Sequence, residues 1–116
     1  MATSQDALID RSVIDELQQG MGPAAFADIA GTFCDQIDSL IEQFASAAEA
    51  GDVATASRLA HELIGLAGTM GAPKLSTIAR QAMALCRNQD VQALPDIAGT
   101  MRRAAGETLE AFRAYA

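Results

Sequence analysis

The sequence is poor in the residues that most often build metal, cofactor and nucleic-acid sites. Its 116 residues include one histidine, no tryptophan and only 4% aromatic side chains, and 8 basic residues stand against 15 acidic ones. A single histidine excludes poly-histidine zinc sites and the paired Glu-x-x-His di-metal sites of helical bundles. Few aromatic residues and a formal charge of −7 disfavour base stacking and nucleic-acid binding, because phosphate backbones repel an acidic protein.

Cysteine and long apolar runs are also scarce. Cys34 and Cys86 lie far apart and form no Cys-x-x-Cys pattern, so we expect two small buried side chains in a reducing compartment and no disulfide framework. No apolar run approaches ~18 residues, so no membrane-spanning helix and no membrane partner are expected. The first ten residues lack the basic and apolar regions of a signal peptide, and the predicted location is the cytoplasm.

What the sequence does contain is helical periodicity along almost its whole length. Apolar residues recur at three- and four-residue steps, whereas the alternation typical of strands is missing. The pattern predicts helices over about residues 12–18, 23–50 and 52–70, a fourth from residue 73 to a turn at 88–90, and a last one that begins near residue 90 or 94.

Capping and helix-breaking residues mark the boundaries between these segments. Ser12 opens a Ser-x-x-Asp sequence that resembles a capping box, and Pro23 suits the first position of a helix. Gly51 fits the position just after a helix, and Asp52 can cap the helix that follows. Gly71 is expected to end that helix.

These helices predict an all-α fold. Four substantial amphipathic helices with short connections imply an antiparallel up-down-up-down four-helix bundle, with the short extra N-terminal helix capping one end. We expect one domain over residues 1–116, a loosely ordered N-terminal segment at 1–11, and a monomer, because the bundle is complete within one chain. The predicted apolar stripe of the long second helix comprises Phe26, Ile29, Ala30, Phe33, Ile37, Leu40, Ile41, Phe44 and Ala48.

The single histidine, His61, falls in the middle of the third predicted helix. At ~100° per residue the core-facing side chains of this helix lie within ~60° of one direction, and His61 lies about 160° from Leu63. We therefore expect the imidazole to point into solvent. The predicted core-facing residues are Ala56, Leu59, Leu63, Leu66, Ala67 and Met70.

The outer strip around His61 consists mostly of very small residues. Its other members are Ala54, Ser57, Arg58, Ile64, Gly65 and Gly68. A mid-helix glycine costs about 1 kcal/mol relative to alanine, so the two exposed glycines favour close approach by another molecule over helix stability. Ile64 is then expected to be an exposed apolar contact at the edge of the strip. A solvated surface histidine without any function is the alternative that these residues leave open.

The residues around His61 resemble a known family. The sequence Ala60-His-Glu-Leu-Ile-Gly65, followed by Gly71-Ala-x-x-Leu75, resembles histidine-containing phosphotransfer (HPt) domains, whose pattern is His-x-Leu-Lys-Gly with a downstream Gly-Ala-x-x-Leu. The resemblance covers nearly the whole chain, including the long helix before the histidine. HPt domains are small helical bundles that relay phosphoryl groups between aspartates of response-regulator receiver domains.

The resemblance implies roles for individual residues. His61 would be the phospho-acceptor, attacked at Nε2, and Gly65 would give the receiver clearance. The family usually has lysine three residues after the histidine, where this chain has Ile64. Positive charge near the phosphoryl group would then come from Arg58, which shares the exposed strip, or from Lys74 at the start of the next helix. The residues expected to contact the partner are Ala54, Ser57, Glu62, Ile64 and Gly68.

The resemblance also implies partners and cofactors. The partners would be receiver domains and a hybrid sensor histidine kinase of bacterial two-component signalling, with the receiver supplying Mg²⁺, so that this chain needs no cofactor or metal of its own. No glycine-rich nucleotide loop is present, so no autokinase activity is expected. The alternative is a non-catalytic docking module that binds receivers or a kinase without carrying phosphate. A metal- or cofactor-binding bundle would need several inward histidines and glutamates, which the sequence lacks.

Overall fold

The structure is a computed structural model that describes residues 8–115, with side chains placed through Phe112. The described residues form five α-helices and one 3₁₀ turn, and they contain no strand. In chain order these elements are α1 (Arg11–Met21), α2 (Pro23–Ala50), α3 (Val53–Thr69), α4 (Pro73–Arg87), η1 (Val91–Ala93) and α5 (Leu94–Tyr115).

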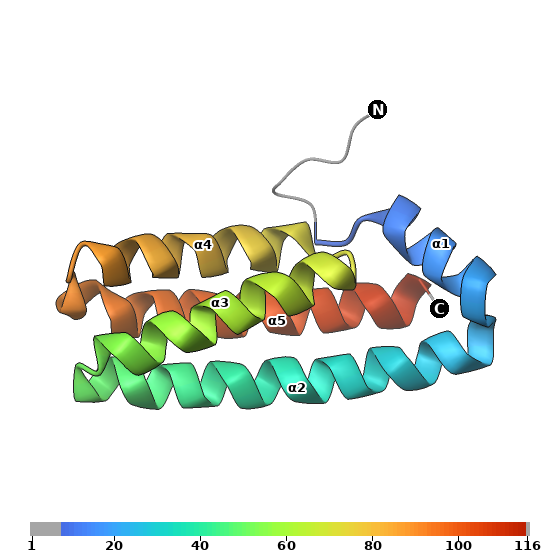
Figure 1. The fold of residues 1–116 in the computed structure, drawn as a ribbon. Coiled ribbons are helices and arrows are strands. Elements are labelled where there is room, and N and C mark those ends of the chain that lie inside the picture. Colours follow the sequence, from blue (N-terminus) through green and yellow to red (C-terminus); the bar gives the residue numbers. More distant parts are fainter. Residues whose placement is uncertain (1–7, 116) are drawn as a thin grey trace.

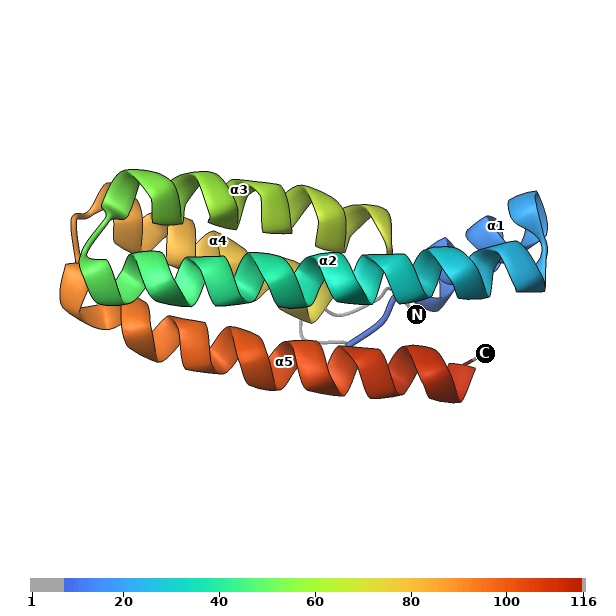
Figure 2. The same cartoon turned by 90° about the horizontal axis from the view of Figure 1, so that it is seen from below.

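The helices α2 to α5 form an antiparallel four-helix bundle (Figures 1 and 2). Each packs against its neighbour in sequence, and α5 closes the ring by packing against α2. The helix α2 extends past the end of α3, and α1 packs against α2 at that extended end (Figure 1). The all-α fold class, with a short extra N-terminal helix on an up-down-up-down bundle, is therefore confirmed.

Local signals fix both ends of the connection between α2 and α3. Gly51 adopts φ +71°, which ends α2, and its N–H donates to the Ala48 carbonyl at 3.2 Å. Asp52 then caps α3: one carboxylate oxygen accepts the Thr55 backbone N–H at 3.2 Å and the other accepts the Thr55 hydroxyl at 2.7 Å. The start of α3 is thus anchored two to three turns before His61, as the sequence predicts.

The start of α1 differs from the prediction. Asp10, and not Ser12, is the N-cap: Asp10 Oδ1 accepts the Ser12 backbone N–H at 3.1 Å and the Ser12 hydroxyl at 2.7 Å. The helix continues through Gly20 to Met21, because Gly22 with φ +86° is the residue that reverses the chain. α1 is therefore longer at both ends than residues 12–18.

The expected loose segment at 1–11 lies only partly within the described residues, since residues 1–7 fall outside them. Ile9 packs against the hydrophobic core. The backbone N–H of Asp10 donates to the Gly71 carbonyl at 2.7 Å, which joins the start of α1 to the turn between α3 and α4. Residues 9–11 thus form defined contacts.

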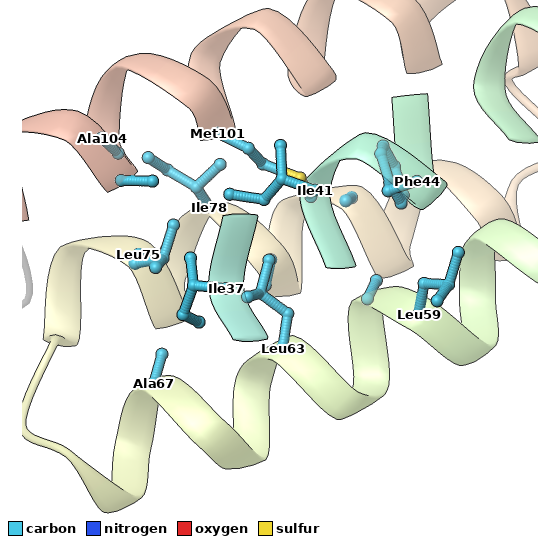
Figure 3. Close-up of a cluster of buried hydrophobic side chains, with 14 of the residues drawn as sticks. Ile37, Ile41, Phe44, Leu59, Leu63, Ala67, Leu75, Ile78, Met101 and Ala104 are labelled. Carbon is cyan, nitrogen blue, oxygen red and sulfur yellow. The ribbon is translucent and has the colours of Figure 1, made fainter. Parts of the chain in front are cut away.

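The core lies along the centre of the bundle, between all four helices (Figure 3). Side chains of α3 point inward toward α2, α4 and α5, and Leu59 and Leu63 are each 1% exposed. Ile29 is an exception to the predicted stripe, being 43% exposed. At ~100° per residue it lies about 70° from the mean direction of the buried residues of α2, at the margin of the stripe.

The contact between α2 and α5 joins the first and last helices of the bundle. The rings of Phe33 and Phe112 meet edge to face, with centroids 5.5 Å apart and planes at 86°. On the surface of the same contact, Arg102 donates two hydrogen bonds of 2.9 Å to the carboxylate of Glu42. This bidentate pair lowers the pKa of Glu42 below its ordinary value.

Candidate functional site

His61 lies on the exposed face of α3, as the periodicity predicts. The neighbouring residues Ala60 and Leu63 are 0% and 1% exposed, so the backbone that carries the imidazole is packed against the core on its inner side. The helix is also anchored at its start by Asp52 and ended at Gly71, whose φ is +74°. The histidine is therefore an exposed side chain on a firmly held helix.

The small residues around His61 have no packing partner that explains them. A Cβ atom added to Gly65 or Gly68 would meet no atom within 4 Å, apart from the backbone of α3 itself. Ala54 is exposed and Ser57 is half-buried on the same strip. These residues leave open space around His61 into which another molecule can reach.

Ile64 is half-buried and packs against the core, which corrects the expectation that it is exposed. The helical position explains the difference, because Ile64 lies about 60° from His61 toward the side of α4. From that position a long aliphatic side chain can reach back to the core. Only part of this residue is left on the surface beside His61.

The two cations predicted to lie near the histidine both pair with carboxylates. Arg58 Nη1 donates to Glu62 Oε1 at 3.2 Å, and the two side chains are 60% and 49% exposed. Lys74 Nζ donates to Glu107 Oε1 on α5 at 3.3 Å. Arg58 and Glu62 are one turn apart on α3 itself, on either side of His61 in the sequence. Lys74, at the start of α4, instead pairs with a residue of the neighbouring helix α5.

A shallow groove between α2 and α3 begins beside His61. Its lining includes Glu62, which follows His61 in the sequence, and Gly65, one turn later, together with the apolar side chains of Leu40 and Leu66. The groove is lined by Gln36, Ser39, Leu40, Glu62, Gly65, Leu66 and Thr69. Gly68, on the other flank of His61, lines a separate hollow next to α4. The two flanks of the histidine therefore face different helices.

The described residues contain no group of three histidine, cysteine or carboxylate side chains that could hold a metal ion. Within the same part of the chain, no helix combines the length and apolar character that crossing a bilayer requires. Cys34 is half-buried and Cys86 is buried, and neither forms a disulfide. Burial raises the pKa of the Cys86 thiol, so that side chain stays protonated.

Comparison with known proteins is consistent with this geometry. The Hpt domain family matches residues 28–115. This chain belongs to the Hpt domain family. The family functions in histidine phosphotransfer in phosphorelays, and its domains interact with receiver domains and kinases. The matched region includes α3 and His61 and excludes α1.

The fold is also similar to that of a solved HPt protein. The crystal structure of histidine-containing phosphotransfer protein B from Pseudomonas aeruginosa PAO1 superposes with a TM-score of 0.87, and the match covers 93% of each chain. The sequence identity is 22%, so this likeness establishes the fold. No curated protein matches the chain.

The structure thus brings some of the predicted site residues together and places others elsewhere. Arg58, Glu62 and Gly65 lie on the same flank of α3, beside His61 and facing α2. Lys74 instead pairs with Glu107 of α5. The ion pair between Arg58 and Glu62 was not predicted. Their i,i+4 spacing is the signal that predicts such a pair. The α2 side of the groove was also missed, because periodicity alone does not show which helices are neighbours.

Proposed function

We propose that this HPt domain is a phosphorelay intermediate that accepts a phosphoryl group on His61 from the aspartate of a receiver domain and passes it to the aspartate of another. The observation that carries the proposal is the placement of His61, an exposed imidazole on an anchored helix with open space at Gly65 and Gly68. The small flanking residues leave room for the phosphoaspartate of a receiver to come within bonding distance of the ring.

The chemistry requires no other catalytic group on this chain. The lone pair on Nε2 attacks phosphorus, the P–O bond to the aspartate breaks, and its electron pair leaves with the carboxylate. The proton on Nδ1 passes to solvent, and transfer to the next receiver reverses these changes. Phosphoryl transfer depends mainly on positioning and charge neutralisation, and α3 provides the positioning by holding His61 on a packed backbone.

Charge neutralisation would be shared between the two proteins. The receiver would supply Mg²⁺ and a lysine, which is why the HPt domain needs no metal site of its own. On this chain Arg58 is the nearest candidate in sequence, one turn before His61, and Gly65 gives clearance. Lys74 is a weaker candidate, since it pairs with Glu107. Ala54, Ser57, Glu62, Ile64 and Gly68 would surround the contact with the receiver.

Phosphotransfer from a radiolabelled receiver tests the proposal. Every receiver domain of the source genome is phosphorylated with labelled acetyl phosphate and mixed with wild-type protein or His61→Gln. We expect acid-labile label on the wild type and none on His61→Gln, with at least one receiver much faster than the rest. Label on His61→Gln, or no label on the wild type from any receiver, would overturn it.

A non-catalytic docking module is the second candidate. It is favoured by Ile64 in place of the family lysine and by the pairing of Arg58 and Lys74 with carboxylates. The same panel separates the two candidates if binding is measured alongside labelling. A receiver that binds wild type and His61→Gln equally but labels neither would identify a docking module.

The remaining parts of the proposal concern the setting. We propose a cytoplasmic monomer that works with receiver domains and with a hybrid sensor kinase. Sedimentation of the free protein tests the monomer, and the phosphotransfer panel identifies the partners.

A further inference from the structure

The charges next to His61 are arranged unevenly around the helix. The family lysine would stand three residues after the histidine, on the flank facing α4, where Ile64 packs against the core. Arg58 stands three residues before His61, about 60° to the other side, on the flank facing α2. It is the only lysine or arginine in α3. The positive charge that α3 itself carries thus lies on the flank opposite to the family's usual position, whereas the flank facing α4 has Arg80 of that helix in the hollow that Gly68 lines.

That charge is already engaged before any phosphoryl group arrives. Arg58 Nη1 donates to Glu62 Oε1 at 3.2 Å, and both side chains are largely exposed. Exposed i,i+4 pairs are weak because water and salt screen them. A phosphoryl group carries close to two negative charges and three acceptor oxygens, and it suits the forked guanidinium better than a carboxylate does. The pair can therefore open when His61 is phosphorylated.

We propose that Glu62 is a positioning residue that competes with the phosphoryl group for Arg58 and so sets how strongly His61 retains phosphate. Before transfer, Glu62 holds Arg58 along the flank of α3 that faces α2. After transfer, the guanidinium donates to the phosphoryl oxygens and the Glu62 carboxylate turns toward solvent. This inference rests on His61 being the phospho-acceptor, the function proposed above.

The competition has a direction that can be measured. Opening the pair opposes phosphorylation of His61, so Glu62 lowers the phosphoryl affinity of this domain and favours transfer onward to an aspartate. Removing the Glu62 carboxylate frees Arg58 in advance. Glu62→Gln is therefore expected to shift the equilibrium between phosphohistidine and phosphoaspartate toward His61 by about twofold, the factor that corresponds to a weak exposed pair.

A double-mutant cycle on the transfer equilibrium tests the proposal. Wild type, Glu62→Gln, Arg58→Gln and the double variant are equilibrated with one phosphorylated receiver, and the label on each protein is counted. Glu16→Gln is the control for charge, since Glu16 is an exposed residue of α1 outside the site. Circular dichroism records the melting temperature of each variant, because a purely helix-stabilising pair would change melting without changing the equilibrium.

The expected pattern is specific. Glu62→Gln shifts the equilibrium toward His61 in the wild-type background, and in the Arg58→Gln background its effect falls to that of Glu16→Gln. An equal shift in both backgrounds would overturn the proposal, because Glu62 would then act by its charge alone. No shift, or a shift toward the receiver, would overturn it too. If the wild type takes no label, the proposed function fails first, so the two failures are distinguishable.

Discussion

Gly65, Gly68 and Gly71 lie within seven residues but in two different environments. The first two are in open space, whereas Gly71 is crowded by neighbouring atoms. An added Cβ at Gly71 would lie 3.1 Å from Val13 Cβ and 3.2 Å from the Asp10 carbonyl oxygen, and its φ is +74°. At Gly65 and Gly68 the added atom would meet nothing within 4 Å, the backbone of α3 aside. Folding therefore requires glycine at position 71 but not at positions 65 and 68.

The same contrast separates the two faces of α3. Its inner residues are fully packed, and their identities follow from the core that they fill. On its outer face, Gly65 and Gly68 lower the intrinsic stability of the helix, and no neighbouring atom lies where their side chains would be. Residues whose choice the fold does not explain are the ones that an external partner can explain, and here they surround His61. Three predictions test this division between residues for folding and residues for transfer, and a fourth concerns the folding contribution of two surface carboxylates.

The largest expected effect is on the inner face. Leu63→Ala should lower the free energy of unfolding by about 3 kcal/mol, because it leaves a cavity in a packed core. His61→Ala, two residues earlier on the outer face, should change it by less than about 0.5 kcal/mol. Urea denaturation measures both. Similar losses for the two variants would remove the distinction between the faces.

Gly71→Ala should destabilise the fold almost as much as Leu63→Ala. The positive φ is unfavourable for alanine, and Val13 and the Asp10 carbonyl crowd the new atom. Together these should lower the free energy of unfolding by about 2 to 3 kcal/mol. Urea denaturation measures this loss. A variant as stable as wild type would mean that α1 shifts away from the turn at little cost.

At Gly65 the same substitution is expected to stabilise the fold instead of destabilising it. Gly65→Ala should stabilise the protein by up to about 1 kcal/mol, since alanine is the better helix former, and should slow phosphotransfer by about tenfold through displacement of the receiver. Gly106→Ala on α5 is the matched control, because its added Cβ also meets nothing within 4 Å. It should stabilise equally and leave the rate of transfer unchanged. Slow phosphotransfer by Gly106→Ala would show that added helix stability alone impairs transfer.

The smallest effect concerns pH. Hydrogen bonds from Arg102 and Thr55 lower the pKa values of Glu42 and Asp52 in the folded protein. A carboxylate with a lowered folded pKa stabilises the fold above its unfolded pKa, and this contribution disappears as pH falls through the folded value. Melting temperature should therefore decrease as pH falls below about 4.5. The decrease should be shallower in Glu42→Gln, and an identical slope would show that the Arg102 pair contributes nothing.

Much of the fold was predictable because its boundaries depend on local chemistry. Pro23 lacks a backbone N–H and suits only the first turn of a helix, while Gly51 and Gly71 reach positive φ at little cost. The cap at Asp10 is itself local, and it was missed because the Ser-x-x-Asp pattern two residues later competes with it. The backbone bond from Asp10 to Gly71, by contrast, joins distant parts of the chain. Such a contact cannot be read from a local pattern.

The site was predictable in direction and not in detail. Periodicity placed His61 outside and Leu63 inside, since a helix of 3.6 residues per turn fixes both directions. It did not show that Ile64 reaches back to the core, because that depends on side-chain length and on how far the neighbouring helices extend. It also left the groove beside His61 unseen, since α2 and α3 build that groove together.

The closure between α2 and α5 has a consequence for the order in which the protein folds. The other bundle contacts join helices that follow one another, and such short-range contacts form quickly. The Phe33–Phe112 and Glu42–Arg102 contacts need nearly the whole chain to be in place. We therefore expect the contact between α2 and α5 to form after the rate-limiting barrier of folding. Substitutions in this contact should then accelerate unfolding and leave the folding rate almost unchanged.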